Sequence, residues 1–189
     1  MLEMITDESG NIEQNRRVAK NMSLCAIINE ILGNLSGPTI FWEYNEEIRK
    51  LKVFSNDGGF TKEDKIAIIK KYKSGRDRGK GTAGVNGIGI RQVFDLISTS
   101  EKIILRTISQ NEKVKMYFYY YKDKPSWMVE DDWEHPVKGD NISHPWGKLD
   151  DTDIKEYNHI CSYCNLDCEE RGSYWEIPIN DKYHDEFIN

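Results

Sequence analysis

A change in hydrophobic period after residue 38 restricts the fold of this chain more than any other feature of its sequence. Over residues 16–34 the apolar side chains recur at helical spacing, and Gly37 and Pro38 follow as helix breakers. Directly after them, residues 39–44 and 48–54 are rich in aromatic and β-branched side chains and are separated by a polar turn. A helix therefore precedes two neighbouring strands, which favours an α+β or α/β fold.

Helical and strand-like segments continue to alternate along the rest of the chain. Thr61 and Asp64 have the spacing of a helix N-cap and its capping-box partner. The later strand-like and helical segments are residues 102–108, 114–121, 151–160 and 174–179. We expect a polar arm at residues 1–15, one domain at 16–180 and a tail at 181–189. The domain would contain an irregular insertion at 122–150 and a cysteine-rich loop at 159–171.

The composition excludes several classes of protein. With 189 residues, 38% of them hydrophobic, the chain is large enough for one domain with a core. The 32 acidic residues outnumber the 26 basic ones, giving a net charge of −6. A uniformly basic nucleic-acid-binding surface is therefore excluded, while a local basic patch stays open. No apolar run approaches the roughly 18–20 residues of a membrane span, and the polar first residues do not resemble a secretory signal. We therefore expect a cytoplasmic protein without a membrane partner.

A glycine-rich sequence, Gly84-Val-Asn-Gly87-Ile-Gly89, lies between a basic loop and an apolar helix-like segment. Glycines before a helix let backbone N–H groups approach an anion, so the sequence is compatible with a phosphate site. By itself it is more typical of a flexible turn. It lacks the Lys-Ser/Thr pair of a P-loop and does not follow the first strand of a βαβ unit, which disfavours a Walker-type NTPase and a Rossmann site.

Glu30 and Asn34 are four residues apart on the first predicted helix and so share one helical face. A carboxylate can take a proton from water, and an amide oxygen is a hard ligand for Mg²⁺, so the pair suits a hydrolytic site. For any single Glu-x-x-x-Asn, two solvated side chains are the simpler explanation.

The order of these segments resembles that of the GHKL ATPase superfamily, which has the Bergerat fold and includes gyrase B, heat-shock chaperone ATPases, MutL, MORC proteins and histidine kinases. The resemblance extends over residues 22–179 and rests on four motifs in the right order. They are the helix with Glu30 and Asn34, the turn Asp57-Gly-Gly59 followed by Phe-Thr-Lys, the glycine-rich sequence, and Gly172-Ser173 before the last strand. The turn is one residue shorter than the family's Asp-x-Gly-x-Gly.

The resemblance implies an α/β (α+β) two-layer sandwich, in which a mixed, mainly antiparallel sheet is covered on one face by helices and binds ATP and Mg²⁺. It implies that Glu30 is the general base for water and that Asn34 holds Mg²⁺. Asp57 would accept a hydrogen bond from the adenine amino group, with Gly59 close to the base and Ser173 supporting Asp57. The loop at 73–86 would be the ATP lid, with a solvated basic loop as the alternative. Phosphate contacts would come from Lys80, Gly84, Gly87 and Gly89.

The function that the resemblance implies is Mg-dependent ATP binding and hydrolysis, used as an ATP-driven conformational switch. No histidine precedes Asn34, which excludes a complete sensor kinase. A small protein kinase of the anti-sigma-factor type and a non-catalytic ATP-binding interaction module remain alternatives. Related ATPases dimerise through an N-terminal arm, so residues 1–15 would serve either in a homodimer or as a disordered tail. A protein partner or further domains are also expected.

Four side chains near residue 160 combine a Cys-x-x-Cys pair with a third thiol and an imidazole, as Cys161, Cys164, Cys168 and His159. They could supply four tetrahedral ligands to Zn²⁺. The second Cys-x-x-Cys typical of such sites is missing, so a reduced loop without metal is the alternative. Cys25 lies on the apolar side of the first predicted helix, where we expect a small core residue.

Overall fold

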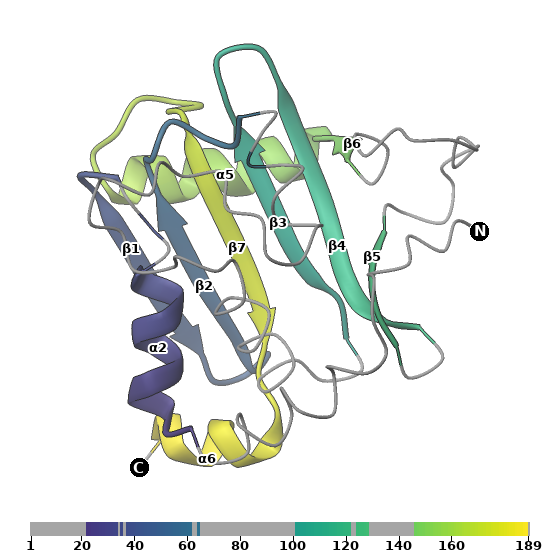
Figure 1. The fold of residues 1–189 in the computed structure, drawn as a ribbon. Helices are drawn as coiled ribbons and strands as arrows, with labels where there is room; N and C mark the ends of the chain where they lie inside the picture. Colours follow the sequence, from purple (N-terminus) through teal and green to yellow (C-terminus); the bar gives the residue numbers. More distant parts are fainter. Residues whose placement is uncertain are drawn as a thin grey trace, which may run out of the picture.

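A computed structural model describes residues 22–33, 35, 37–61, 64, 101–121, 124–128 and 146–188 of the chain. These residues form seven strands and three helices, an α+β arrangement (Figure 1). In chain order they are α2 (Leu24–Gly33), β1 (Ile40–Asn45), β2 (Lys50–Ser55), β3 (Ile103–Ile108), β4 (Lys113–Tyr121), β5 (Lys124–Met128), β6 (Gly147–Lys148), α5 (Asp151–Tyr163), β7 (Gly172–Pro178) and α6 (Asp181–Ile188).

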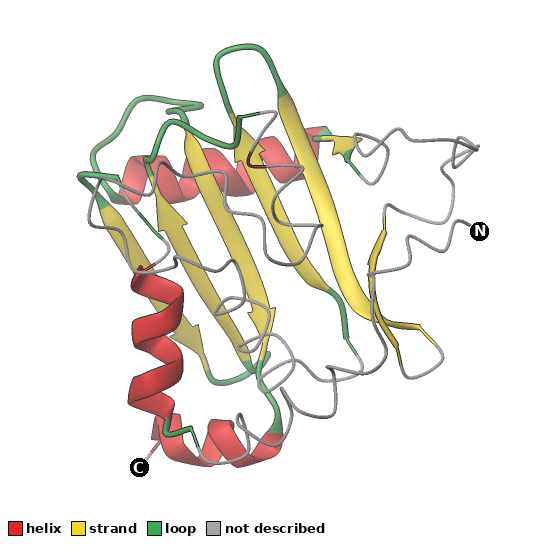
Figure 2. Ribbon diagram, viewed as in Figure 1, coloured by secondary structure: helices red, strands yellow, loops and turns green. Residues whose placement is uncertain are grey.

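The strands form one twisted sheet in the order β1-β2-β7-β3-β4-β5, and the short β6 pairs with β4 (Figure 2). Every pairing among the described strands is antiparallel, so the mixed sheet that we expected is not found in this part of the chain. The last strand in sequence, β7, lies between β2 and β3. Residues separated by more than a hundred positions therefore meet at the centre of the sheet.

Helices pack on both faces of this sheet. Leu51 and Val53 on β2, and Trp175 and Ile177 on β7, join the core cluster that contains Ile27 and Ile31 of α2. The alternate residues Phe54 and Tyr174 join a second cluster with Tyr157, Ile160 and Cys161 of α5. Because successive side chains of a strand point to opposite faces, α2 and α5 lie on opposite sides. The two-layer arrangement with one covered face was therefore wrong for the described elements.

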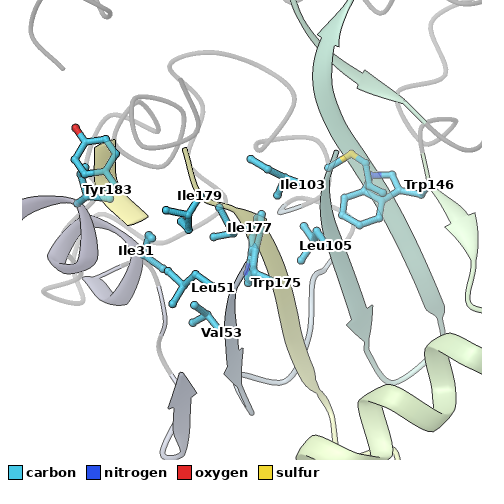
Figure 3. Close-up of a cluster of buried hydrophobic side chains, with 12 residues drawn as sticks. Ile31, Leu51, Val53, Ile103, Leu105, Trp146, Trp175, Ile177, Ile179 and Tyr183 are labelled. Atoms are coloured by element: carbon cyan, nitrogen blue, oxygen red, sulfur yellow. The ribbon is translucent and has the colours of Figure 1, made fainter. Parts of the chain in front are cut away.

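The larger core cluster lies on the α2 face and joins α2, the central strands and α6 (Figure 3). Its members include Ile31, Leu105, Trp175 and Ile177, all buried, and Tyr183 of α6. α6 contributes further contacts to this face, because Phe187 stacks on Tyr44 with ring centroids 4.2 Å apart. We expected a tail at 181–189, but the chain forms a helix there.

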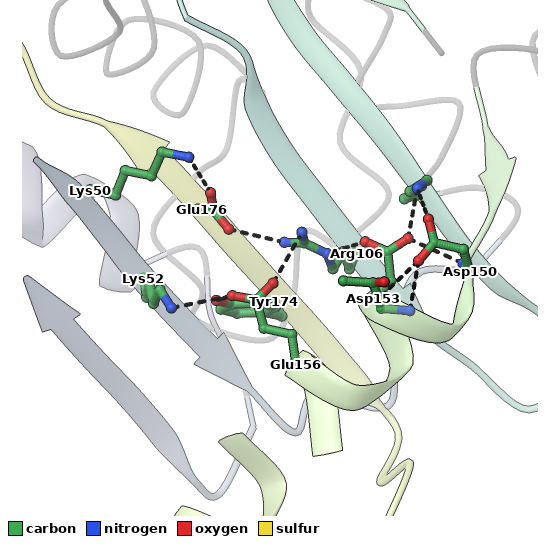
Figure 4. Close-up of polar contacts among 10 residues, drawn as sticks. Lys50, Lys52, Arg106, Asp150, Asp153, Glu156, Tyr174 and Glu176 are labelled. Atoms are coloured by element: carbon green, nitrogen blue, oxygen red, sulfur yellow. Dashed lines mark hydrogen bonds and ion pairs between the residues drawn. The ribbon is translucent and has the colours of Figure 1, made fainter. Parts of the chain in front are cut away.

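The α5 face carries an ion-pair network in place of a continuous apolar surface (Figure 4). At its centre, Arg106 Nε lies 2.7 Å from Asp153 Oδ1, and its Nη atoms lie 3.3 Å from Glu156 and 3.4 Å from Glu176. The outer cations and their partners are Lys50 with Glu176, Lys52 with Glu156, and Lys115 with both Asp150 and Asp153. Burial opposes the charge of Arg106, but these carboxylates raise its pKa above the ordinary value.

Several of the predicted elements are confirmed. The two strands around a polar turn are β1 and β2, and residues 102–108 and 114–121 correspond to β3 and β4. The capping box also forms, because Thr61 N donates to Asp64 Oδ2 at 3.0 Å and Asp64 N donates to Thr61 Oγ1 at 3.1 Å. The insertion is less irregular than expected, since it contains β5 and β6.

Two predictions about the helices need correction. α5 extends to Tyr163, three residues beyond the predicted segment, so His159 and Cys161 lie on a helix rather than in a loop. A capping box at Asp150 and Asp153 starts this helix. Cys25 of α2 is exposed and is not a core residue, because Ile27 and Ile31 are the side chains that α2 buries.

Candidate functional site

Three hydroxyl side chains lie side by side on adjacent strands at one end of the sheet. Ser55 on β2 is opposite Ser173 on β7, and Ser173 is opposite Thr107 on β3. We call these three residues the hydroxyl row. All three are buried, at 0%, 0% and 1% relative exposure. Each lies two residues along its strand from Val53, Leu105 or Trp175 and so points to the same side as that residue, which places the row on the α2 face.

Each member of the hydroxyl row holds a loop against the sheet. Ser55 Oγ accepts a hydrogen bond from Gly37 N at 3.1 Å. Thr107 Oγ1 accepts from Phe60 N at 2.8 Å and donates to Gly172 O at 3.1 Å. Ser173 Oγ donates to Asp57 Oδ2 at 2.9 Å. The row therefore fixes the chain on both sides of the turn that carries Asp57.

Asp57 stands on a turn whose shape depends on glycine. Its other carboxylate oxygen, Oδ1, accepts from Gly59 N at 3.1 Å, which closes the turn on itself. Gly58 and Gly59 have φ angles of 88° and 75°, in the left-handed region that favours glycine. A Cβ on Gly59 would also collide with the carbonyl group of Ile108. The turn and β3 thus approach each other as closely as two backbones can.

Aromatic side chains flank this turn on the α2 face. The ring of Phe60 lies 6.1 Å from that of Trp175 and 5.9 Å from that of Trp146, measured between centroids. Trp146 is buried and its Nε1 has no hydrogen-bond partner in the described part of the chain. The carboxylate of Asp57 is itself only partly buried. A polar acceptor is therefore held at the border of an apolar, aromatic surface.

Tyr157 of α5 approaches the same end of the sheet from the opposite face. Its hydroxyl donates to Glu170 O at 2.9 Å. Burial raises the pKa of Tyr157 above its ordinary range, and the charges of nearby Asp57 and Glu170 add to this effect. Tyr157 therefore stays protonated and acts as a donor that supports the chain preceding Ser173.

The structure brings together three of the predicted site residues, namely Asp57, Gly59 and Ser173. Glu30 lies on α2 and is partly buried. In the sequence it falls between Ile27 and Ile31, the two residues that this helix buries in the core. The remaining predicted nucleotide and metal residues, Asn34, Lys80, Gly84, Gly87 and Gly89, lie outside the described residues, as does the predicted lid at 73–86.

The predicted zinc ligands are not assembled. In the part of the chain that the structure describes, which includes all four side chains, no group of three His, Cys, Asp or Glu residues is placed to hold a metal ion. Cys161 is buried in the α5 cluster, whereas Cys168 is exposed. His159 precedes Cys161 by two positions, about 200° around the helix, so the two side chains diverge. The zinc site therefore stays a prediction that the described residues do not bear out as a formed site.

Sequence reasoning missed Ser55, Thr107 and Gly37. The two hydroxyl residues are strand residues with no motif around them, and only the register of β2, β7 and β3 brings them next to Ser173. One signal was present in the sequence, because each of the three strands carries a small hydroxyl residue near one end, on the same side as its apolar residues.

Comparisons with known proteins do not add a relative. A scan against models of protein families finds no match for this chain, and a search of curated proteins finds no similar sequence. Within the described residues, no helix has both the length and the apolar character needed to cross a membrane.

Proposed function

We propose that this chain binds ATP with Mg²⁺ and hydrolyses it, as a GHKL-type domain with a Bergerat-like site on the α2 face. The observation that carries the proposal is the hydrogen bond between Ser173 and Asp57, two residues 116 positions apart. The family resemblance pairs these two positions in an adenine site. Nothing in local sequence requires a serine on the last strand to meet an aspartate after the second.

The chemistry of the turn fits an adenine base. A carboxylate is an acceptor only, with room for more than one hydrogen bond on each oxygen, so it suits the exocyclic amino group of adenine. Ser173 Oγ and Gly59 N each donate a hydrogen bond to one oxygen of Asp57, which fixes the orientation of the carboxylate. The flanking aromatic rings of Phe60 and Trp175 supply the apolar environment that purine-binding pockets have. Gly59 supports the fit, because a side chain there would collide with the backbone of Ile108 and displace the turn that carries Asp57.

The catalytic part of the proposal rests on α2. Glu30 would take a proton from the attacking water, and Asn34 would hold Mg²⁺. Lys80 and the three glycines at 84, 87 and 89 would contact the phosphates. When bound, Mg²⁺ would neutralise charge on the phosphates.

Calorimetry with ATP and Mg²⁺ tests the adenine site. Asp57→Asn should abolish measurable binding, since losing one member of a charged hydrogen bond that the bound base would bury costs about 2–5 kcal/mol. Ser173→Ala should weaken binding roughly tenfold, because it removes one hydrogen bond to a charged group while leaving the carboxylate in place. Ser162→Ala, an exposed serine on α5, is the matched control and should bind like the wild type. Unchanged ATP affinity in Asp57→Asn would refute the site.

Phosphate release separates hydrolysis from binding alone. Glu30→Gln should bind ATP nearly normally and turn it over about 10²–10⁴ times more slowly. Asn34→Ala should lose affinity as well as turnover. A wild-type protein that binds ATP without releasing phosphate would instead support the kinase or the non-catalytic binding module, and adding candidate protein substrates with labelled ATP would distinguish those two.

A further inference from the structure

β1 forms one end of the sheet among the strands that the structure describes (Figure 1). Asn56 N donates to Thr39 O at 3.2 Å, which makes Thr39 and Asn56 a hydrogen-bonded pair. Since bonded and non-bonded pairs alternate in an antiparallel ladder, the backbone groups of Ile40, Trp42 and Tyr44 point away from β2. These N–H and C=O groups form a backbone edge that a further strand can pair with.

The side chains of β1 lack the usual protection of such an edge. Ile40 and Trp42 are 43% and 49% exposed. Trp42 is paired with Val53, and Ile40 lies two residues before it, so both side chains point to the α2 face. On the opposite face, Phe41 meets the ring of Tyr163, which is itself 71% exposed. Edge strands of monomeric proteins typically carry several charges, a proline or a bulge. Here one of the six residues, Glu43, is charged, and Lys52 stands opposite it on β2.

We propose that β1 pairs antiparallel with β1 of a second copy, making one continuous sheet across a two-fold axis. When Trp42 is placed opposite Trp42 of the other copy, Ile40 falls opposite Tyr44. All three residues have outward backbone groups, so each of these pairs can exchange both hydrogen bonds of an antiparallel ladder. Their side chains all lie on the α2 face, so the exposed apolar surface of one copy is covered by the same surface of the other.

The charge on β1 selects this register over its neighbour. Moving the axis one residue on, to Glu43, also pairs outward backbone groups, but it sets Glu43 directly opposite Glu43 of the second copy. Like charges directly opposite each other destabilise a strand pair. In the proposed register Glu43 instead faces Phe41. With the axis at Phe41 instead, Tyr44 falls opposite Pro38, which has no N–H to donate. The register centred on Trp42 is therefore the one that pairs all three outward residues without a like-charge contact, as an isologous contact requires.

The length of β1 limits how tight this contact can be. A six-residue strand buries less surface than the roughly 1,200–2,000 Å² of a stable interface. The dimer should therefore dissociate on dilution rather than persist as an obligate assembly. It uses a surface different from residues 1–15, so it does not depend on the proposed ATP site or on the N-terminal arm.

Analytical ultracentrifugation over a roughly hundredfold range of concentration tests the proposal. The wild type should shift from monomer to dimer, and Trp42→Lys should shift the midpoint at least tenfold higher. Ile48→Lys is the matched control, because Ile48 is 50% exposed in the turn after β1 but is not part of the strand. A wild type that stays monomeric would overturn the proposal, and would leave a strand of another protein as the occupant of the edge. A dimer that persists in Trp42→Lys would overturn it as well.

Cysteine cross-linking tests the register even if Trp42→Lys folds poorly. In a protein whose exposed Cys25 and Cys168 are replaced by serine, Trp42→Cys should form a disulfide-linked dimer under mild oxidation. Directly opposite residues of a bonded pair have Cα atoms about 5.5 Å apart, within the range of a disulfide. Glu43→Cys should cross-link more slowly. Equal rates, or faster linkage at position 43, would refute the register.

Discussion

Replacing Arg106 by methionine should destabilise this protein strongly, because it removes the central cation of the ion-pair network. The Arg106 side chain is 7% exposed and lies within 3.4 Å of Asp153, Glu156 and Glu176. Its guanidinium also lies over the ring of Tyr174, at 5.3 Å from the centroid. Methionine keeps most of the length and the apolar contact but none of the charge.

The magnitude follows from what the three carboxylates retain. Breaking a buried ion pair by removing one partner costs about 3–5 kcal/mol when the other charge is left uncompensated. Here Lys50 still lies 2.6 Å from Glu176, and Lys115 still lies 2.7 Å from Asp153, so each buried carboxylate keeps one cation. We therefore expect the lower end, about 3 kcal/mol. For a domain of this size that corresponds to a fall in melting temperature of roughly 6–12 °C.

Thermal and urea unfolding followed by circular dichroism measure this loss. Arg49→Met is the matched control, because Arg49 pairs with Asp181 but the two side chains are 50% and 90% exposed. An exposed pair contributes about 0–1 kcal/mol, so this variant should melt close to the wild type.

The pH dependence gives a second readout of the same network. Burial raises the pKa of Glu176, but Lys50 and Arg106 outweigh burial and hold it below its ordinary value of 4.5. A depressed carboxyl pKa contributes stability above the unfolded pKa, and that contribution is lost as the pH falls through the folded pKa. The gap between Arg106→Met and wild type should therefore be full at pH 7 and shrink below 4.5. Equal losses in Arg106→Met and Arg49→Met, or a gap that grows on acidification, would refute this reasoning.

Two further predictions concern the turn and the thiols. An alanine in the left-handed conformation costs about 1–3 kcal/mol. Gly59→Ala should lower the free energy of unfolding by more than this, because its Cβ also collides with the backbone of Ile108. Gly58→Ala should show the conformational cost alone, because a Cβ at Gly58 meets nothing within 4 Å. Melting curves of the two variants compare these costs. Alkylation at neutral pH, followed by mass spectrometry, should modify the exposed Cys25 well before Cys161, because burial raises the pKa of Cys161 to about 11. Added Zn²⁺ should leave both alkylation rates unchanged.

Local signals in the sequence were sufficient where neighbouring residues decide the structure. The hairpin of β1 and β2 follows from strand-like segments on either side of a polar turn. The capping box of Thr61 and Asp64 forms because the two residues lie within one helical turn of each other. The meeting of Asp57 with Ser173 depends on contacts across the whole chain, and only the order of motifs predicted it. Composition and periodicity alone would have missed it.

Sequence reasoning failed where the sheet decides the role of a residue. No motif in the sequence marks Arg106, Asp153 and Glu176 as buried charges, and it is the packing of α5 against β3 and β7 that buries them. Cys-x-x-Cys spacing also says nothing about which side of a helix each thiol occupies, and it did not indicate that Cys161 packs in the α5-face cluster. α6 was missed because its polar residues outnumber its apolar ones, and Tyr183 and Phe187 form its apolar side only when counted at helical spacing.

The alternation of side chains along β7 links the two faces of the sheet. Ser173 and Trp175 point to the α2 face, where the candidate site lies, whereas Tyr174 and Glu176 point to the ion-pair network. Neighbouring residues of β3 also point to opposite faces: Thr107 belongs to the hydroxyl row on the α2 face, and Arg106, directly before it, belongs to the ion-pair network. A strand is fixed in register by both faces together, so ion pairs on one side also set the position of the hydroxyls on the other. The network on the α5 face therefore serves the candidate site without contacting it, by holding the two strands that carry Ser173 and Thr107.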